Sequence, residues 1–166
     1  MQPTRQPAPA GPGLRDPELA APELQSVRAR RAELRATLAA LEQALAAPAQ
    51  GREDLWGVGV RESLATLVTD FAEHVRVTEG SDGLHQAITT AAPRLIHAVR
   101  QLTDEHSRIA AELAELTSLA RPPLGRTEVE VVRTKATRLL GGLARHRQRG
   151  ADLIYEAYET DIGGTD

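Results

Sequence analysis

Apolar residues recur every three or four positions along four separate segments of this 166-residue chain. This spacing lines one face of an α-helix, whereas a half-buried strand needs alternation in steps of two. Aromatic residues, which strands favour, make up only 2% of the sequence. The pattern therefore predicts an all-α fold, with apolar stripes at residues 24–45, 60–74, 95–116 and 129–157.

Proline and glycine clusters separate the four segments. Residues 48–51 end the first helix, and Arg121, Pro122 and Pro123 end the third. The sequence EGSDG at residues 79–83 interrupts the second helix and is followed by a short helical piece from Leu84 to Ile88. Short connections place successive helices antiparallel. The expected architecture is an antiparallel up-down four-helix bundle with its second helix broken near residues 79–83.

The chain has the length of one domain. Residues 1–15 are rich in proline and glycine without apolar periodicity, which predicts a disordered leader, and residues 16–166 are assigned to the bundle. The first helix starts at Asp16 and Pro17, or a few residues later after Pro22. The last helix is expected to end near Asp161, before two glycines.

The overall composition excludes several classes of site. The chain has no cysteine, so disulfides, thiolate nucleophiles and cysteine-ligated metals are excluded. Its net charge is −3, and its arginine runs at residues 27–31 and 145–149 are typical of solvated helix faces, so no nucleic-acid partner is expected. No apolar run of about 18 residues and no signal peptide is found. We therefore expect a cytoplasmic protein with no membrane partner.

Three histidines fall on the inward stripes of different helices: His74 on the second, His106 on the third and His146 on the fourth. Since a helix rises about 1.5 Å per residue, His74 and His106 both lie roughly 20–25 Å from the chain reversal near residue 91. His146 falls within about 10 Å of the same level. A buried imidazole needs a partner, so each of the three is either a hydrogen-bonded core residue or part of a shared metal or carboxylate site.

Two further histidines and one arginine lie outside this convergence. His85 follows the glycine break and His97 lies off the apolar stripe, so both are expected to be exposed. Arg31 occupies the seam of the first helix, where it either holds a carboxylate through paired hydrogen bonds or extends outward to solvent.

Several short segments resemble the hemerythrin-like, HHE cation-binding family. They are His74 and Val75 followed by Thr78, Glu79 and Gly80, then DEH at residues 104–106, and the closing segment RHRQRGADLIYEAYETDIGG. The resemblance covers roughly residues 24–164. It implies a four-helix bundle with a non-haem di-iron centre held by histidines and bridging carboxylates, used for oxygen binding, iron handling or redox sensing. It matches His74, His106 and His146 to histidine ligands of the second, third and fourth helices.

The chain departs from the family pattern at three places. Residues 24–47 contain no histidine, and Thr78 and Gly150 stand where the family has glutamates. The resemblance therefore implies a reduced or vestigial metal site, with iron as the cofactor and His74, His106 and His146 as ligands. Water or Glu79 would complete the shell. Glu79 lies one residue after the position at which the family has its glutamate. It therefore joins the site only if the broken segment turns it inward, and is otherwise a solvated residue at a helix end.

Two functions of different classes follow. One is a hemerythrin-like metal site for oxygen or redox sensing or for iron handling, without enzymatic turnover, since no nucleophile with an adjacent base is visible. The alternative is a metal-free helical bundle that acts as a protein-interaction or structural module. In that case the leucine stripe of the first helix would serve a homodimer or another protein partner.

Overall fold

The computed structural model of the protein describes residues 21–158, with side chains at residue 32 and residues 34–158. The predicted leader at residues 1–15, the helix start at Asp16 and the helix end near Asp161 lie outside the described residues, as does the side chain of Arg31.

The described chain consists of helices joined by short connections. The α-helices are α1 (Ala21–Ala46), α2 (Glu53–Glu79), α3 (Leu84–Ala91), α4 (Ile96–Leu119) and α5 (Arg126–Tyr158), with one 3₁₀ turn, η2 (Pro93–Leu95). Residues 21–158 contain no strand, so the predicted all-α class is confirmed. Within the same range, no helix combines the length and the apolar character needed to cross a membrane.

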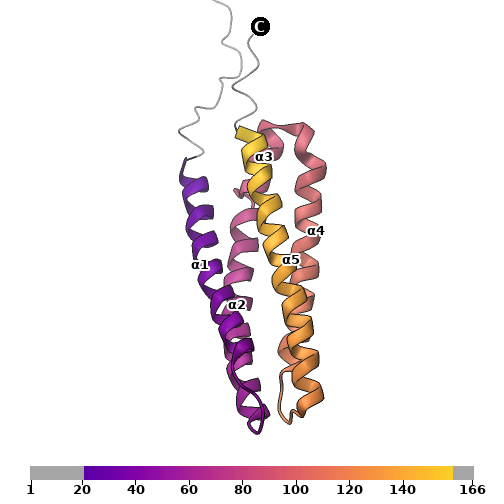
Figure 1. The fold of residues 1–166 in the computed structure, drawn as a ribbon. Helices are drawn as coiled ribbons and strands as arrows, with labels where there is room; N and C mark the ends of the chain where they lie inside the picture. The colour runs from indigo at the N-terminus through magenta and orange to yellow at the C-terminus, as the bar shows by residue number, and fades with distance from the viewer. Residues whose placement is uncertain (1–20, 159–166) are drawn as a thin grey trace, which may run out of the picture.

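The four long helices lie side by side, and their connections alternate between the two ends of the molecule (Figure 1). α1 packs mainly against α2, and α4 packs against α5. Contacts between α2 and α4 join these two pairs, while the short α3 touches all four long helices near one end. The apolar stripes of the long helices consequently face a common interior.

The interior divides into two apolar clusters with a layer of imidazoles between them. The larger cluster contains Phe71 on α2, Ile109 on α4 and Leu143 on α5. The smaller one lies at the α3 end and consists of Leu84, Ile88, Ala92, Leu95, Val99, Leu102, Leu153 and Ala157. His106 separates the two clusters along α4, and His146 separates them along α5. The helical periodicity thus continues across this layer, but with histidine in place of leucine.

A tight turn ends α2 at the level of the imidazole layer. The backbone N–H of Gly83 donates to the carbonyl oxygen of Gly80 at 2.8 Å. A Cβ atom at Gly83 would lie 2.6 Å from the carbonyl oxygen of Thr78 and 2.8 Å from that of Gly80, so only glycine fits this position. The break predicted at residues 79–83 is present, and it leaves Glu79 as the last residue of α2.

Candidate metal centre

Three histidine side chains from three helices converge in the imidazole layer. His74 of α2, His106 of α4 and His146 of α5 are all buried. Their ring centroids are 5.1 Å apart for His74 and His106, 5.7 Å for His74 and His146, and 4.7 Å for His106 and His146. One ring nitrogen of each lies within 4.8 Å of the other two. The structure therefore brings together the three histidines that helical periodicity placed at one level.

Phe71 forms the apolar side of this cluster. Its ring lies one turn before His74 on α2, and its centroid is 5.9 Å from that of His74, 5.7 Å from His106 and 6.5 Å from His146. Phe71 is also among the most deeply buried side chains of the larger apolar cluster. Because aromatic edges and faces attract each other, this ring fixes the orientation of the imidazoles as well as filling space.

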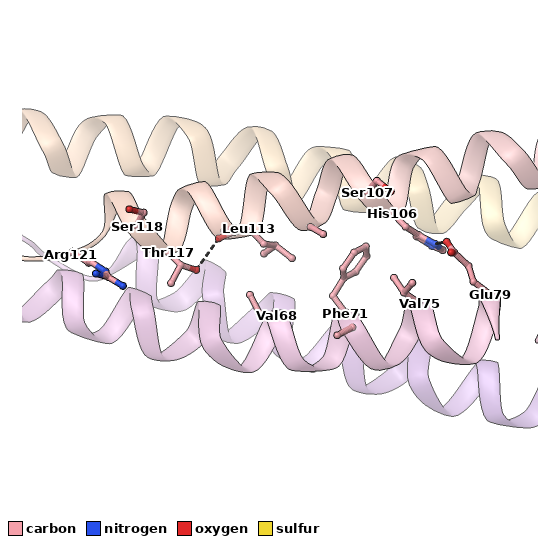
Figure 2. A pocket seen from close by; sticks show the side chains of 13 residues that line it. Val68, Phe71, Val75, Glu79, His106, Ser107, Leu113, Thr117, Ser118 and Arg121 are labelled. Carbon is pink, nitrogen blue, oxygen red and sulfur yellow. Dashed lines mark hydrogen bonds and ion pairs between the residues drawn. The ribbon is translucent and has the colours of Figure 1, made fainter.

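Glu79 reaches the cluster through the outer nitrogen of His106. The Nδ1–H of His106 donates to the carboxylate of Glu79, whose side chain is 29% exposed. Figure 2 shows the two side chains meeting at the end of α2. Glu79 is therefore turned inward, but it orients His106 and does not add a carboxylate oxygen to the three converging nitrogens.

Glu105 plays the corresponding part for His146, although its place next to the seam residue His106 makes it only a weak candidate from the sequence. The Nδ1–H of His146 donates to Glu105 Oε2 at 2.9 Å, while Arg149 donates to Oε1 at 2.7 Å. Burial raises the pKa of Glu105, but the hydrogen bonds from Arg149 and His146 and the charge of Arg149 outweigh it, so that the pKa falls below its ordinary value. Glu105 is consequently an ionised acceptor at neutral pH.

These two hydrogen bonds determine which nitrogens face the centre of the cluster. A neutral imidazole that donates from Nδ1 carries an unprotonated lone pair at Nε2. His106 and His146 both donate from Nδ1, and their Nε2 atoms face each other at 3.1 Å. Two lone pairs at this distance repel each other unless a cation or a proton lies between them.

The separation of the two Nε2 atoms fits shared coordination of one metal ion. Imidazole nitrogens bind zinc at about 2.0–2.1 Å, so two of them on one ion lie about 2.9–3.4 Å apart at octahedral or tetrahedral angles. The observed 3.1 Å falls within this range. Three imidazoles without a thiolate suit iron, zinc, copper or nickel, and metal-ligating histidines usually donate their other N–H to a carboxylate or carbonyl, as His106 and His146 do here.

Burial keeps His146 neutral. It lowers the pKa of the imidazole, and this effect exceeds that of the hydrogen bond donated to Glu105, which raises the pKa, while the charge of His106 lowers it further. At neutral pH the Nε2 atom of His146 is therefore available as a ligand.

His85 was predicted to be exposed, and this prediction is wrong. Its side chain is 9% exposed and its ring stacks parallel to that of His106, with 5.7 Å between centroids. Its Nδ1 lies 3.2 Å from the hydroxyl of Thr103. The reason is that α3 folds back onto α4 and buries the face that His85 shares with Ile88. His97, in contrast, is exposed as expected.

The burial of His85 predicts acid sensitivity of the metal-free protein. Burial, followed by the charge of His106, lowers the pKa of His85 to about 4, with Glu79 opposing and His146 adding to the effect. Between pH 6.5 and about 4, His85 stays neutral in the folded chain but takes up a proton in the unfolded chain. The free energy of unfolding should therefore decline as pH falls from 6.5, the ordinary pKa, towards 4, and should be unaffected by this group above 6.5.

Urea unfolding at pH 7, 6 and 5 measures this effect. His85→Gln should show a shallower decline than the unmodified chain, with a residual slope from His146. His97→Gln removes an exposed histidine and should keep the original slope. Equal slopes for all three proteins would exclude His85 as the source.

The positions at which the family pattern has glutamates offer no ligand. Thr78 is buried, and its hydroxyl donates to the backbone carbonyl of His74 at 2.9 Å. Gly150 has no side chain, and it borders a small cavity together with Leu34 and Leu38 of α1. The described side chains that border this cavity include Arg35 and Arg147 but no carboxylate, so the ligand set consists of imidazoles.

Comparison with protein-family models, with curated proteins and with solved structures finds no match to this chain. The function is therefore inferred from the geometry of its side chains.

Proposed function

We propose that the chain is a hemerythrin-like protein in which the four long helices form an antiparallel up-down bundle around a single transition-metal site. His74, His106 and His146 are the proposed ligands. The main support is the pair of Nε2 atoms of His106 and His146, which face each other at 3.1 Å while both Nδ1–H groups are engaged by carboxylates. A cation between the two rings removes the repulsion of their lone pairs.

Iron is the proposed metal, since the sequence resembles a family that uses non-haem iron and since imidazole suits this ion. Bound iron would supply the oxygen or redox response, and the chain's own residues orient the rings and exclude water. Glu79 and Glu105 hold His106 and His146 in the required tautomers, and Phe71 closes the apolar side. Without bridging carboxylates at Thr78 and Gly150, the proposed site holds one ion and not two.

Metal titration tests the proposal. Chelator-treated protein is titrated anaerobically with ferrous iron, and separately with zinc, and the bound metal is counted after desalting. One ion per chain is expected. A protein that retains no metal beyond a denatured control would overturn the proposal.

The second candidate is a metal-free bundle that acts as a protein-interaction or structural module. It is supported by the same 3.1 Å contact, which also fits an N–H···N hydrogen bond if one ring is charged. That arrangement requires an added proton, and burial lowers the pKa of His146, so it is favoured by acid. Under this candidate the protein binds no metal at pH 7, and light scattering after size exclusion should detect a homodimer.

Replacing Glu105 with glutamine is expected to weaken metal binding under the proposed function. Glu105→Gln keeps the shape of the side chain but removes the negative charge that holds the Nδ1–H of His146. Loss of such a carboxylate partner costs about 10- to 100-fold in metal affinity, and we expect a value near tenfold for this conservative change. Competition with a chromophoric zinc chelator measures the affinity. Glu112→Gln, an exposed change on the same helix, should have no effect; an equal loss in both variants would contradict the role of Glu105.

A further inference from the structure

A long groove runs between α2 and α4 on the surface of the bundle. Its volume is about 610 Å³. Val68 and Val75 of α2 and Leu113 of α4 line it with apolar atoms, and Phe71 lies at its base (Figure 2). This volume is within the range of about 300–1,000 Å³ that is typical of small-molecule sites.

The groove exists because small side chains occupy its walls. Ala72 of α2 and Ala110 and Ala114 of α4 are exposed and line it. Exposed helix positions usually carry long polar side chains, which would cover such a groove. Alanine leaves the space open and makes its surface apolar.

The two ends of the groove differ in charge. Arg121 stands at one end, and Glu79 with His106 at the other (Figure 2). Among residues 34–158, no carboxylate forms an ion pair with Arg121, whereas Glu79 already accepts a hydrogen bond from His106. The cationic end is therefore open to an anionic group, and the opposite end repels one.

The length of the groove favours an extended occupant. From His106 to Leu119, the last residue of α4, the helix rises about 20 Å, and Arg121 lies just beyond its end. An extended acyl chain of about sixteen carbons has this length.

We propose that this groove binds one long-chain monocarboxylic acid, with its carboxylate on Arg121 and its acyl chain running over the alanines towards Phe71. The guanidinium of Arg121 matches a carboxylate through paired hydrogen bonds. The apolar walls bury the acyl chain, and the charge of Glu79 sets the direction in which the ligand enters. This site does not depend on the proposed metal.

Calorimetric titration of chelator-treated protein with hexadecanoate, below its micelle concentration, tests the proposal. One site per chain is expected. Arg121→Gln should weaken binding about tenfold, since it removes the charged partner of the carboxylate. Ala114→Leu fills the middle of the groove and should abolish saturable binding, and because leucine is also a strong helix former, the helix is retained.

Two controls separate this site from general hydrophobic adsorption. Arg100→Gln removes an exposed arginine elsewhere on α4 and should leave the affinity unchanged. Hexadecanol, which lacks the carboxylate, should bind less tightly and should not respond to Arg121→Gln. Absence of saturable hexadecanoate binding, or equal binding by all variants, would overturn the proposal. The proposal would also be overturned if the unmodified protein is a dimer that Ala114→Leu dissociates and that hexadecanoate does not affect. The groove would then be an interface between copies of the chain.

Discussion

Replacing His106 with alanine is expected to lower the affinity for zinc or ferrous iron by more than about a hundredfold. His106 supplies one of the three converging nitrogens and is the neighbour of His146 Nε2 at 3.1 Å. Loss of an outer carboxylate partner alone costs about 10- to 100-fold, so loss of the ligand itself should cost more. Calorimetric titration of the metal-free variant measures the change, and His74→Ala and His146→Ala should behave alike.

His97→Ala is the matched control for these variants. It lies on the same helix as His106 but is exposed, and its Nε2 lies 3.2 Å from the Gln101 side chain. Its metal affinity should equal that of the unmodified protein. If the His106 variant, shown by circular dichroism to be helical, binds metal as tightly as the control, then His106 is not a ligand.

Replacing Phe71 with alanine is expected to lower the free energy of unfolding by about 3–5 kcal/mol, the range typical of a buried aromatic residue. Phe71 is 2% exposed and joins the larger apolar cluster to all three imidazoles. Its removal leaves a cavity and takes away the ring contacts that orient the histidines. Urea unfolding of the metal-free protein at pH 7 measures the loss.

Two further variants serve as controls for Phe71→Ala. Phe71→Leu retains most of the apolar volume and should cost less than the alanine change. Val58→Ala, at a 40% exposed position of the same helix, should change stability by less than about 0.5 kcal/mol. A Phe71→Ala loss as small as that of Val58→Ala would show that the ring does not support the core as the structure indicates.

The convergence of the three histidines could be predicted from the sequence because two simple quantities determine it. The helical period fixes which side chains point inward, and the rise per residue fixes their height. His74 follows Phe71 by three residues, and His106 precedes Ile109 by three, so each continues an apolar stripe. The heights are counted from the chain reversals, whose positions the glycine and proline clusters mark in the sequence.

The partners of these histidines depend on features that periodicity does not encode. Glu79 reaches His106 because the Gly80–Gly83 turn ends α2 there. Glu105 meets His146 only through the lateral placement of α5 beside α4. His85 is buried because a short helix folds back after a glycine break, and its direction cannot be extrapolated from the helix before it. The spacing of His85 and Ile88 by three residues was the one available signal.

X-ray absorption spectroscopy of the zinc-loaded protein tests the proposed metal centre most directly. Zinc is suitable as a probe because it has no redox chemistry and its nitrogen distances are well defined. The geometry predicts one zinc per chain with three imidazole nitrogens at about 2.0–2.1 Å, and loss of one imidazole from the shell in His146→Ala. A shell of oxygen atoms alone, or the same shell in the His146 variant, would contradict a centre built from His74, His106 and His146.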